Sequence, residues 1–117
     1  NLGDRVEFVG WVDNASGKMK ELYGHARIFV STSYFESFGL TVLEALSAGC
    51  YPVLSDIPGH RYVIGDDRHF FTKADPVSLR ERLRSAMKSK SLKHAVDITP
   101  FLWKNVIRAY EKALGGR

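Results

Sequence analysis

Long hydrophobic runs are missing from this chain of 117 residues. Unbroken apolar stretches such as residues 28–30 fall far short of the roughly 18 residues that suggest a membrane span. Cysteine is nearly missing too: Cys50 is the single one, so no disulfide can form within the chain. We therefore expect a soluble protein of a reducing, cytoplasmic compartment, without a signal peptide.

Patterns of metal ligands are also missing. The histidines stand singly in the sequence, without an HExxH pair and without a second cysteine beside them. We expect surface or capping positions for all of them: His25, His60, His69 and His94. The sequence therefore predicts no metal and no other cofactor.

The overall composition is that of one globular domain. Hydrophobic residues make up 44% and charged residues 26% of the chain, which excludes disorder and fibrous repeats. The length argues against two domains. Seventeen Lys and Arg against 13 Asp and Glu give a net charge of +4, a surplus that suits a phosphate-bearing ligand without requiring one.

Strand and helix patterns alternate along the chain. Short runs rich in β-branched and aromatic residues predict strands at residues 6–9, 26–30, 51–54 and 69–71. Helices are predicted at residues 18–23, 40–48 and 99–114, with one further helical turn at 61–65. Another helix is predicted to begin at residue 76 and to end at the polar run 88–91. The economical connection is the βαβ crossover, which implies a parallel sheet with flanking helices.

Helix ends and apolar faces can also be predicted. Ser16 is suited to cap the first helix, and Asp75 followed by Pro76 is the expected cap and first-turn proline of a later one. The buried stripe of that later helix is predicted to be Leu79, Leu83 and Met87. A second stripe, on the last helix, comprises Leu102, Val106, Tyr110 and Leu114.

The segment of residues 33–45 lies between a predicted strand and a predicted helix, where the ligand crevice of an open parallel sheet forms. Gly39 allows a ligand to approach the backbone, and the amides of Phe38, Gly39 and Leu40 at the helix start suit a phosphate. Glu36, just before the helix, can accept hydrogen bonds from a sugar hydroxyl group.

A purely structural interpretation is equally open from spacing alone. Glu36 complements the helix dipole, Ser37 is a suitable N-cap, and Glu44, one turn beyond Leu40, falls on a face typical of solvated glutamates. Carboxylates near a helix start are common, so their spacing does not choose between these interpretations.

A family resemblance favours the functional interpretation. Glu36 and Glu44 are separated by seven residues in ESFGLTVLE, which ALSAGCYPVLSDIPGHRYVI follows. This stretch resembles the donor-binding signature of the retaining GT-B glycosyltransferases called family 4, and the likeness extends from residues 6–10 to residues 101–103. The resemblance implies that residues 1–117 are a single α/β, Rossmann-like unit, the later part of a C-terminal donor-binding domain.

The same resemblance implies the reaction and the site. The family transfers a sugar from a nucleotide-diphosphate sugar to an acceptor hydroxyl with retention of configuration, generally without a metal ion. Positive groups and helix ends stabilise the departing diphosphate. Glu36 is then the candidate catalytic residue on the donor sugar, and Glu44 binds the ribose. The implied donor-binding residues are Gly10, Trp11, Val12, Ser37, Phe38, Gly39, Leu40, Thr41 and Glu44.

Departures from the family pattern limit what the chain does alone. Thr32 and Ser37 stand where the family often has Pro and Gly, and Arg61 and Tyr62 stand where a Glu is frequent. The N-terminal acceptor domain and the upstream Arg and Lys that grip the diphosphate are not in this sequence. We therefore expect that this fragment is inactive alone. We also expect its unpaired sheet edges and its last helix, through Phe101 and Trp103, to bind a partner domain or a second copy of the chain.

Two alternatives stay open. One is a noncatalytic α/β module that binds a nucleotide or a protein through the same helix end. The other concerns the basic residues around 80–93, which spread round their helix and so predict no nucleic-acid partner, but leave open a contact with the anionic inner membrane surface.

Overall fold

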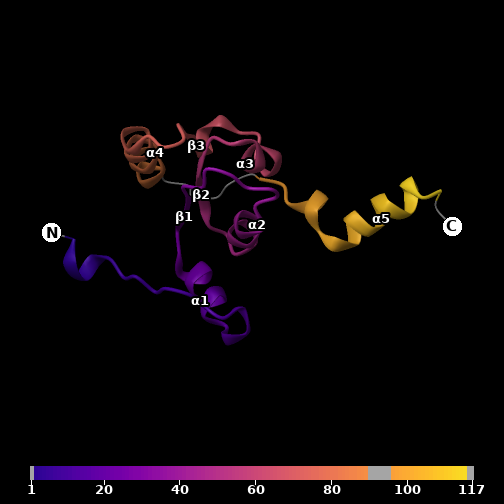
Figure 1. Cartoon of the computed structure of the whole chain (residues 1–117), viewed down its shortest axis with the longest axis horizontal. Helices are drawn as coiled ribbons and strands as arrows, with labels where there is room; N and C mark the ends of the chain where they lie inside the picture. Colours follow the sequence, from indigo (N-terminus) through magenta and orange to yellow (C-terminus); the bar gives the residue numbers. More distant parts are fainter. Residues whose placement is uncertain (1, 90–95, 116–117) are drawn as a thin grey trace.

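The computed structural model describes residues 2–89 and 96–115, and its centre is a small parallel sheet (Figure 1). Its strands are β1 (Ile28–Ser31), β2 (Tyr51–Ser55) and β3 (Phe70–Phe71), in the spatial order β1-β2-β3. β1 and β2 pair in parallel from Ile28↔Tyr51 to Ser31↔Leu54, and β3 pairs with the end of β2. The predicted parallel α/β arrangement is confirmed.

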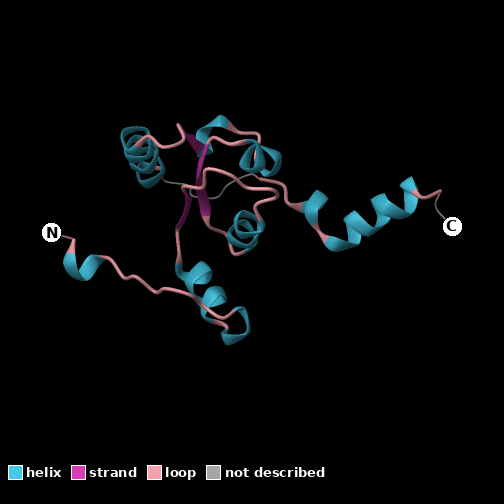
Figure 2. Cartoon of the chain, viewed as in Figure 1, coloured by secondary structure: helices cyan, strands magenta, loops and turns pink. Residues whose placement is uncertain are grey.

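In the described part of the chain, the helices are α1 (Lys18–His25), α2 (Leu40–Ser47), α3 (Pro58–Val63), α4 (Pro76–Lys88) and α5 (Trp103–Ala113). Helices α2, α3 and α4 lie beside the sheet, and α5 extends away from it (Figure 2). Short 3₁₀ turns add η1 (Gly3–Arg5), η2 (Asn14–Ser16), η3 (Asp67–His69) and η4 (Thr99–Phe101). None of the helices in the described residues is long and apolar enough to cross a membrane.

The core forms on both faces of β2, because successive side chains of a strand point to opposite sides. Leu54 packs with Val42 and Leu46 of α2 and with residues of α3, whereas Val53 packs with Phe71 and with Ala86 of α4. β2 is therefore a central strand covered by helices on each side, which explains its nearly continuous apolar sequence.

Helix α4 starts where the sequence predicts. Asp75 accepts hydrogen bonds from two backbone amides of the first turn, and Pro76 follows as the first helical residue. Its predicted stripe is wrong at Met87, which is 69% exposed, while Ala86 is buried. A helix turns about 100° per residue, so position 86 returns to within about 20° of Leu79, whereas position 87 lies about 80° away.

Three further predictions do not hold. Residues 6–9 form no strand, and Phe8 is 95% exposed, because a strand needs a neighbour to pair with its backbone (Figure 2). Ser16 is not the cap residue of α1: Gly17 is, although the Ser16 hydroxyl still accepts a hydrogen bond from the Lys18 amide. The helix predicted at 99–114 is divided: Leu102 has extended backbone angles between η4 and α5, and no residue of α5 is buried.

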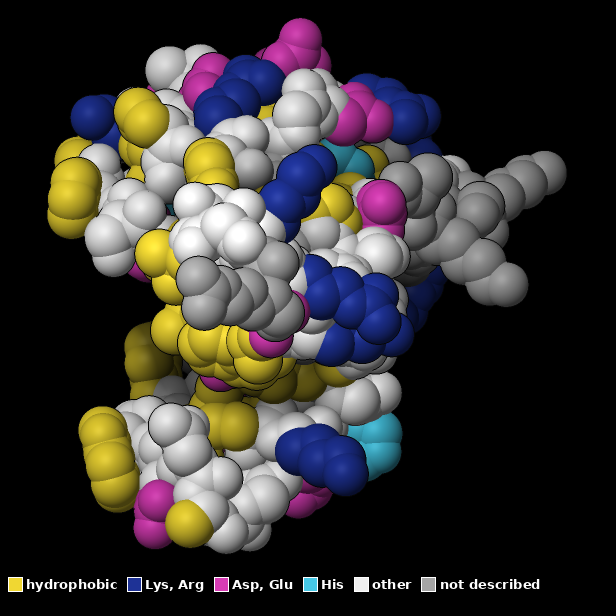
Figure 3. All heavy atoms as spheres, turned by 90° about the vertical axis from the view of Figure 1, so that its right-hand side faces the viewer, with side chains coloured by type: hydrophobic (Ala, Val, Ile, Leu, Met, Phe, Trp, Pro, Cys, Tyr) yellow, Lys and Arg dark blue, Asp and Glu magenta, His cyan; other side chains and the backbone are white. Residues whose placement is uncertain are grey.

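The exposed face of α5 follows from its position, since the helix extends away from the sheet (Figure 1). Trp103, Ile107 and Tyr110 are all more than half exposed. Seen from the α5 end of the molecule, hydrophobic side chains gather beside Lys and Arg side chains (Figure 3). The expected need for a partner over this helix stays a prediction.

Candidate functional site

The turn between β1 and α2 gives the candidate site its form. Gly39 is the N-cap of α2 and has the left-handed backbone angles φ 70 and ψ 49, which glycine adopts without strain. No side chain caps this helix, so the alternative role of Ser37 as its cap is wrong. The amides of Leu40 and Thr41 make no hydrogen bond among the described residues and stay available to an anion.

The Phe38 side chain packs against other aromatic rings. Its ring packs against Tyr62 and Phe101, with ring centroids 5.8 and 5.9 Å away. Phe101 is thus engaged within the described chain, whereas Trp103 is 79% exposed. This aromatic cluster fixes the loop that carries the predicted donor-binding amides.

Glu36 lies at the carboxyl end of β1, as predicted, and is held by its surroundings. Its Oε1 accepts a hydrogen bond of 3.0 Å from the Ser33 hydroxyl. The Ser33 carbonyl accepts a 2.6 Å bond from the Ser55 hydroxyl, which ties the loop to the end of β2. Gly59 of α3 packs directly on the Glu36 backbone: a Cβ at position 59 would be 2.1 Å from the Glu36 carbonyl oxygen.

Glu44 lies on α2 beside a second set of groups. Its Oε2 accepts a hydrogen bond of 3.3 Å from the Tyr23 hydroxyl of α1. Burial and the nearby Glu44 carboxylate raise the pKa of Tyr23 to about 12, so the phenol stays protonated and keeps donating. A cavity of about 560 Å³ opens here, lined by Asn14, Met19, Lys20, Tyr23, Glu44, Ser47 and Ala48. It has room for a nucleoside.

The residues predicted for the nucleotide base lie outside the lining of this cavity. Gly10 has a positive φ of 73, Trp11 is 88% exposed, and Val12 is half-buried, all on the extended segment before α1. Their role in binding a base stays a prediction, as do the roles of Ser37, which is exposed on the turn, and of Thr41, which is exposed at the start of α2.

Cations are scarce around the turn. The sequence has no Lys or Arg between Arg27 and Arg61. Arg61 itself is committed to the carboxylates of Asp56 and Asp67, and this pairing raises the pKa of its guanidinium and lowers the pKa of Asp56. Arg61, which departs from the family pattern, therefore serves a local ion-pair cluster.

Two histidines are buried, which makes the predicted surface or capping positions wrong for them. His60 has no exposed area, and His69 has 3%. His69 Nδ1 donates to the Pro52 carbonyl at 2.9 Å, and burial lowers the pKa of its imidazole. Sequence reasoning failed here because a single histidine carries no periodic signal of burial.

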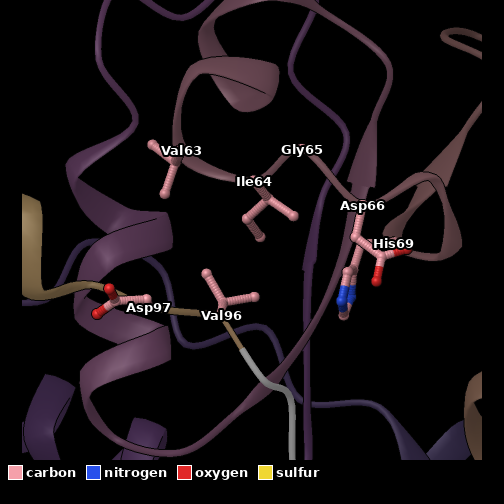
Figure 4. Close-up of a pocket in the computed structure, with 7 residues that line it drawn as sticks. All are labelled: Val63, Ile64, Gly65, Asp66, His69, Val96 and Asp97. Atoms are coloured by element: carbon pink, nitrogen blue, oxygen red, sulfur yellow. The ribbon is translucent and has the colours of Figure 1, made fainter.

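His69 lines a further cavity of about 250 Å³ (Figure 4). Its walls are Val63, Ile64, Gly65, Asp66, His69, Val96 and Asp97. The cavity lies where β3 begins, whereas the ligand crevices of parallel sheets lie where strands end. Within the described residues, no group of three His, Cys, Asp or Glu side chains is arranged to hold a metal ion.

Several residues of the site were not singled out by sequence reasoning. They are Ser31, Ser33, Tyr23, Ser55, Gly59 and His60. The hydroxyl-rich end of β1, STS, was the one available signal, because hydroxyls after a buried strand can serve a ligand as well as a turn. The other residues come from elements distant in sequence.

The known proteins that are similar to this chain are named as glycosyltransferases. Residues 1–112 match the family model described as "Glycosyl transferases group 1". An O-antigen chain mannosyltransferase B of Escherichia coli is 38% identical over 61 residues, which are 52% of this chain and 16% of that protein. A component of the phosphatidylinositol N-acetylglucosaminyltransferase of Arabidopsis thaliana is 31% identical over 87 residues, 74% of this chain and 19% of the relative.

A third relative is a GDP-mannose:cellobiosyl-diphosphopolyprenol alpha-mannosyltransferase of Xanthomonas oryzae pv. oryzae. It is 46% identical over 57 residues, 49% of this chain and 14% of that protein. The chain thus spans less than one fifth of the length of each of these three relatives.

Proposed function

Since the chain belongs to the glycosyl transferases group 1 family, we propose that it is the donor-binding part of a retaining glycosyltransferase. The whole protein then transfers a sugar from a nucleotide-diphosphate sugar to an acceptor hydroxyl. The bond from the anomeric carbon to the diphosphate breaks, a bond to the acceptor oxygen forms on the same face of the sugar, and the hydroxyl proton leaves with the diphosphate.

One observation carries this proposal. Glu36 and Glu44 frame a turn at the carboxyl end of β1, with the uncapped start of α2 between them. A carboxylate before the helix and another one turn into it are separated by helix amides that can bind phosphate oxygens. Such a turn matches a ligand with a sugar at one end, a diphosphate in the middle and a ribose at the other end.

Each residue then has a chemical role. Glu36 accepts hydrogen bonds from hydroxyls of the donor sugar. The amides of Phe38, Gly39 and Leu40 stabilise the charge that develops on the departing diphosphate. Glu44 binds the ribose hydroxyls, and the cavity beside Tyr23 is the place we propose for the nucleoside.

We also propose that this chain binds its donor without transferring the sugar. The turn itself contains no Lys or Arg, and Lys20 is the cation in the lining of the proposed nucleoside cavity. Donor binding by the chain should therefore be weak, and transfer should need cations and an acceptor site from another part of the protein.

Calorimetry with UDP, GDP and ADP tests the site directly. We expect one of these nucleotides to bind, and we expect Glu44→Ala to abolish the binding. Glu81→Ala, which removes an exposed glutamate from α4, is the matched control and should leave it unchanged. Equal binding by both variants would contradict the ribose assignment, and binding of none of the nucleotides by the wild-type chain would contradict a complete site within it.

A further inference from the structure

A buried histidine joins the ends of two strands beneath Glu36. The His60 imidazole, on α3, has no exposed area. Its Nδ1 lies 2.8 Å from the Ser55 carbonyl oxygen and 3.3 Å from the Ser55 hydroxyl, while its Nε2 lies 3.2 Å from the Ser31 hydroxyl. Ser31 ends β1 and Ser55 ends β2, so the imidazole connects the carboxyl ends of neighbouring strands.

The partners define which atoms donate. A carbonyl oxygen can only accept, so Nδ1 of His60 carries a proton. The Ser55 hydroxyl donates its own hydrogen to the Ser33 carbonyl, and its oxygen therefore accepts from Nδ1. In the neutral ring, Nε2 is left as the acceptor for the Ser31 hydroxyl. Every contact of the imidazole has a partner of the right kind.

This network ends on Glu36. The Ser33 hydroxyl donates its hydrogen to Glu36 Oε1 at 3.0 Å, so its 3.3 Å contact with Ser31 depends on the single Ser31 hydrogen, which the Ser33 oxygen shares with His60 Nε2 at 3.2 Å. Ser33 is thus held at its carbonyl by Ser55 and at its hydroxyl by Glu36. Among the described residues no hydrogen bond reaches Glu36 Oε2, so this oxygen is free for a ligand hydroxyl.

We propose that His60 is a positioning residue for Glu36. By linking Ser31 to Ser55, it fixes the loop so that Oε1 stays on Ser33 and Oε2 remains free for the donor sugar. This inference rests on the proposed donor site. Burying a polar imidazole costs desolvation free energy that an apolar side chain would not cost. Because every polar atom of the ring has a partner, the hydrogen bonds hold the loop in a single position.

The first experiment needs no ligand. The imidazole ¹⁵N shifts of the wild-type chain should show a proton on Nδ1. Glu36→Gln should move the Nε2 resonance of His60, and this response should disappear in a Ser31→Ala background. Glu44→Gln is the matched control, because Glu44 bonds to Tyr23 instead. A proton on Nε2 alone, or equal responses to the two glutamine variants, would overturn the proposal.

The second experiment separates positioning from folding. Calorimetry compares GDP-mannose with GDP, and UDP-glucose with UDP, for the wild-type chain, Ser31→Ala and His60→Asn. An Asn amide can still donate to the Ser55 carbonyl as Nδ1 does, but cannot reach Ser31. We expect each variant to bind the sugar nucleotide about three- to tenfold more weakly, with an unchanged affinity for the parent nucleotide.

The double variant should be no weaker than either single variant, because both substitutions cut the same link. Equal weakening of sugar nucleotide and parent nucleotide would mean a merely structural role and would overturn the inference. Binding of neither ligand by the wild-type chain would instead contradict the proposed function, and the imidazole shifts would still decide whether His60 and Glu36 are linked.

Discussion

Replacing Gly59 with alanine puts a methyl group where the backbone of Glu36 already lies. The added Cβ would be 2.1 Å from the Glu36 carbonyl oxygen and 2.8 Å from its carbonyl carbon. Ordinary contacts of a Cβ begin at 3.4 Å, so the two segments must separate by 3.4 − 2.1 = 1.3 Å. Neither partner is the end of a flexible side chain, and the movement therefore displaces the loop that carries Glu36.

Two effects of opposite sign decide the magnitude. Gly59 lies within α3, where alanine is intrinsically favoured over glycine by about 1 kcal/mol. Overpacking of a close contact costs about 1–3 kcal/mol, and here the obstacle is backbone, so we expect the upper part of that range. The net loss in free energy of unfolding should be about 1–2 kcal/mol, from the difference of these two contributions.

Binding should suffer more selectively than stability. A misplacement of about 1 Å at a reacting group can cost about a hundredfold. We therefore expect Gly59→Ala to weaken binding of a sugar nucleotide by at least about tenfold. Its parent nucleotide, which depends on Glu44 and the helix amides, should be less affected.

Urea unfolding followed by circular dichroism, together with calorimetry, measures both effects. Gly65→Ala is the matched control, because a Cβ at position 65 meets no atom within 4 Å. That variant should be as stable as the wild-type chain or slightly more stable, since alanine restricts the unfolded chain. A Gly59→Ala chain that is as stable as Gly65→Ala and binds sugar nucleotides equally well would refute the reasoning.

Three other predictions concern separate parts of the chain. Asp75→Ala should lower the free energy of unfolding by about 1 kcal/mol, since two amides of α4 lose their acceptor, and urea unfolding at pH 7 measures the loss. Because burial lowers the pKa of His69 in the folded chain, the unfolded chain binds more protons as the pH falls through about 6.5. Stability should therefore decline between pH 7.5 and pH 5.5, and the decline should be smaller in His69→Asn, whose amide can still donate to Pro52; parallel declines would contradict this. Tyr23→Phe should weaken nucleotide binding about two- to tenfold in calorimetry, because Glu44 loses the hydroxyl that orients it; unchanged affinity would exclude that role.

Local patterns in the sequence account for much of the fold. The runs that became β1 and β2, the helix between them and the cap of α4 are all read from neighbouring residues, and the structure confirms them. The predicted strand at 6–9 failed because its apolar pattern needs a pairing partner that the described chain does not offer. The same reason explains the exposed stripe of α5, which is strongly amphipathic but extends away from the core.

In the candidate site, too, the sequence predicted the residues that are close together in the chain but not those that come from other helices. The spacing of Glu36 and Glu44 around Gly39 is local, so the motif placed them correctly at the start of α2. Tyr23 lies outside the stretch that carries the resemblance, and His60, although within it, lies on α3, 24 positions after Glu36. No short pattern links them to the glutamates they serve.

By itself, the sequence determined the strand–turn–helix unit, the position of the glutamates on it and the family to which they point. Helix starts, caps and strand alternation depend on contacts a few residues apart, so they are written in short patterns. Tertiary structure alone decided that Gly59 supports the backbone of Glu36, that His60 is buried between two strand ends, and that Tyr23 meets Glu44 beside a cavity. The contacts of Gly59 with Glu36, of His60 with Ser31 and of Tyr23 with Glu44 join residues 21 or more positions apart, and only the packing of the helices on the parallel sheet brings them together.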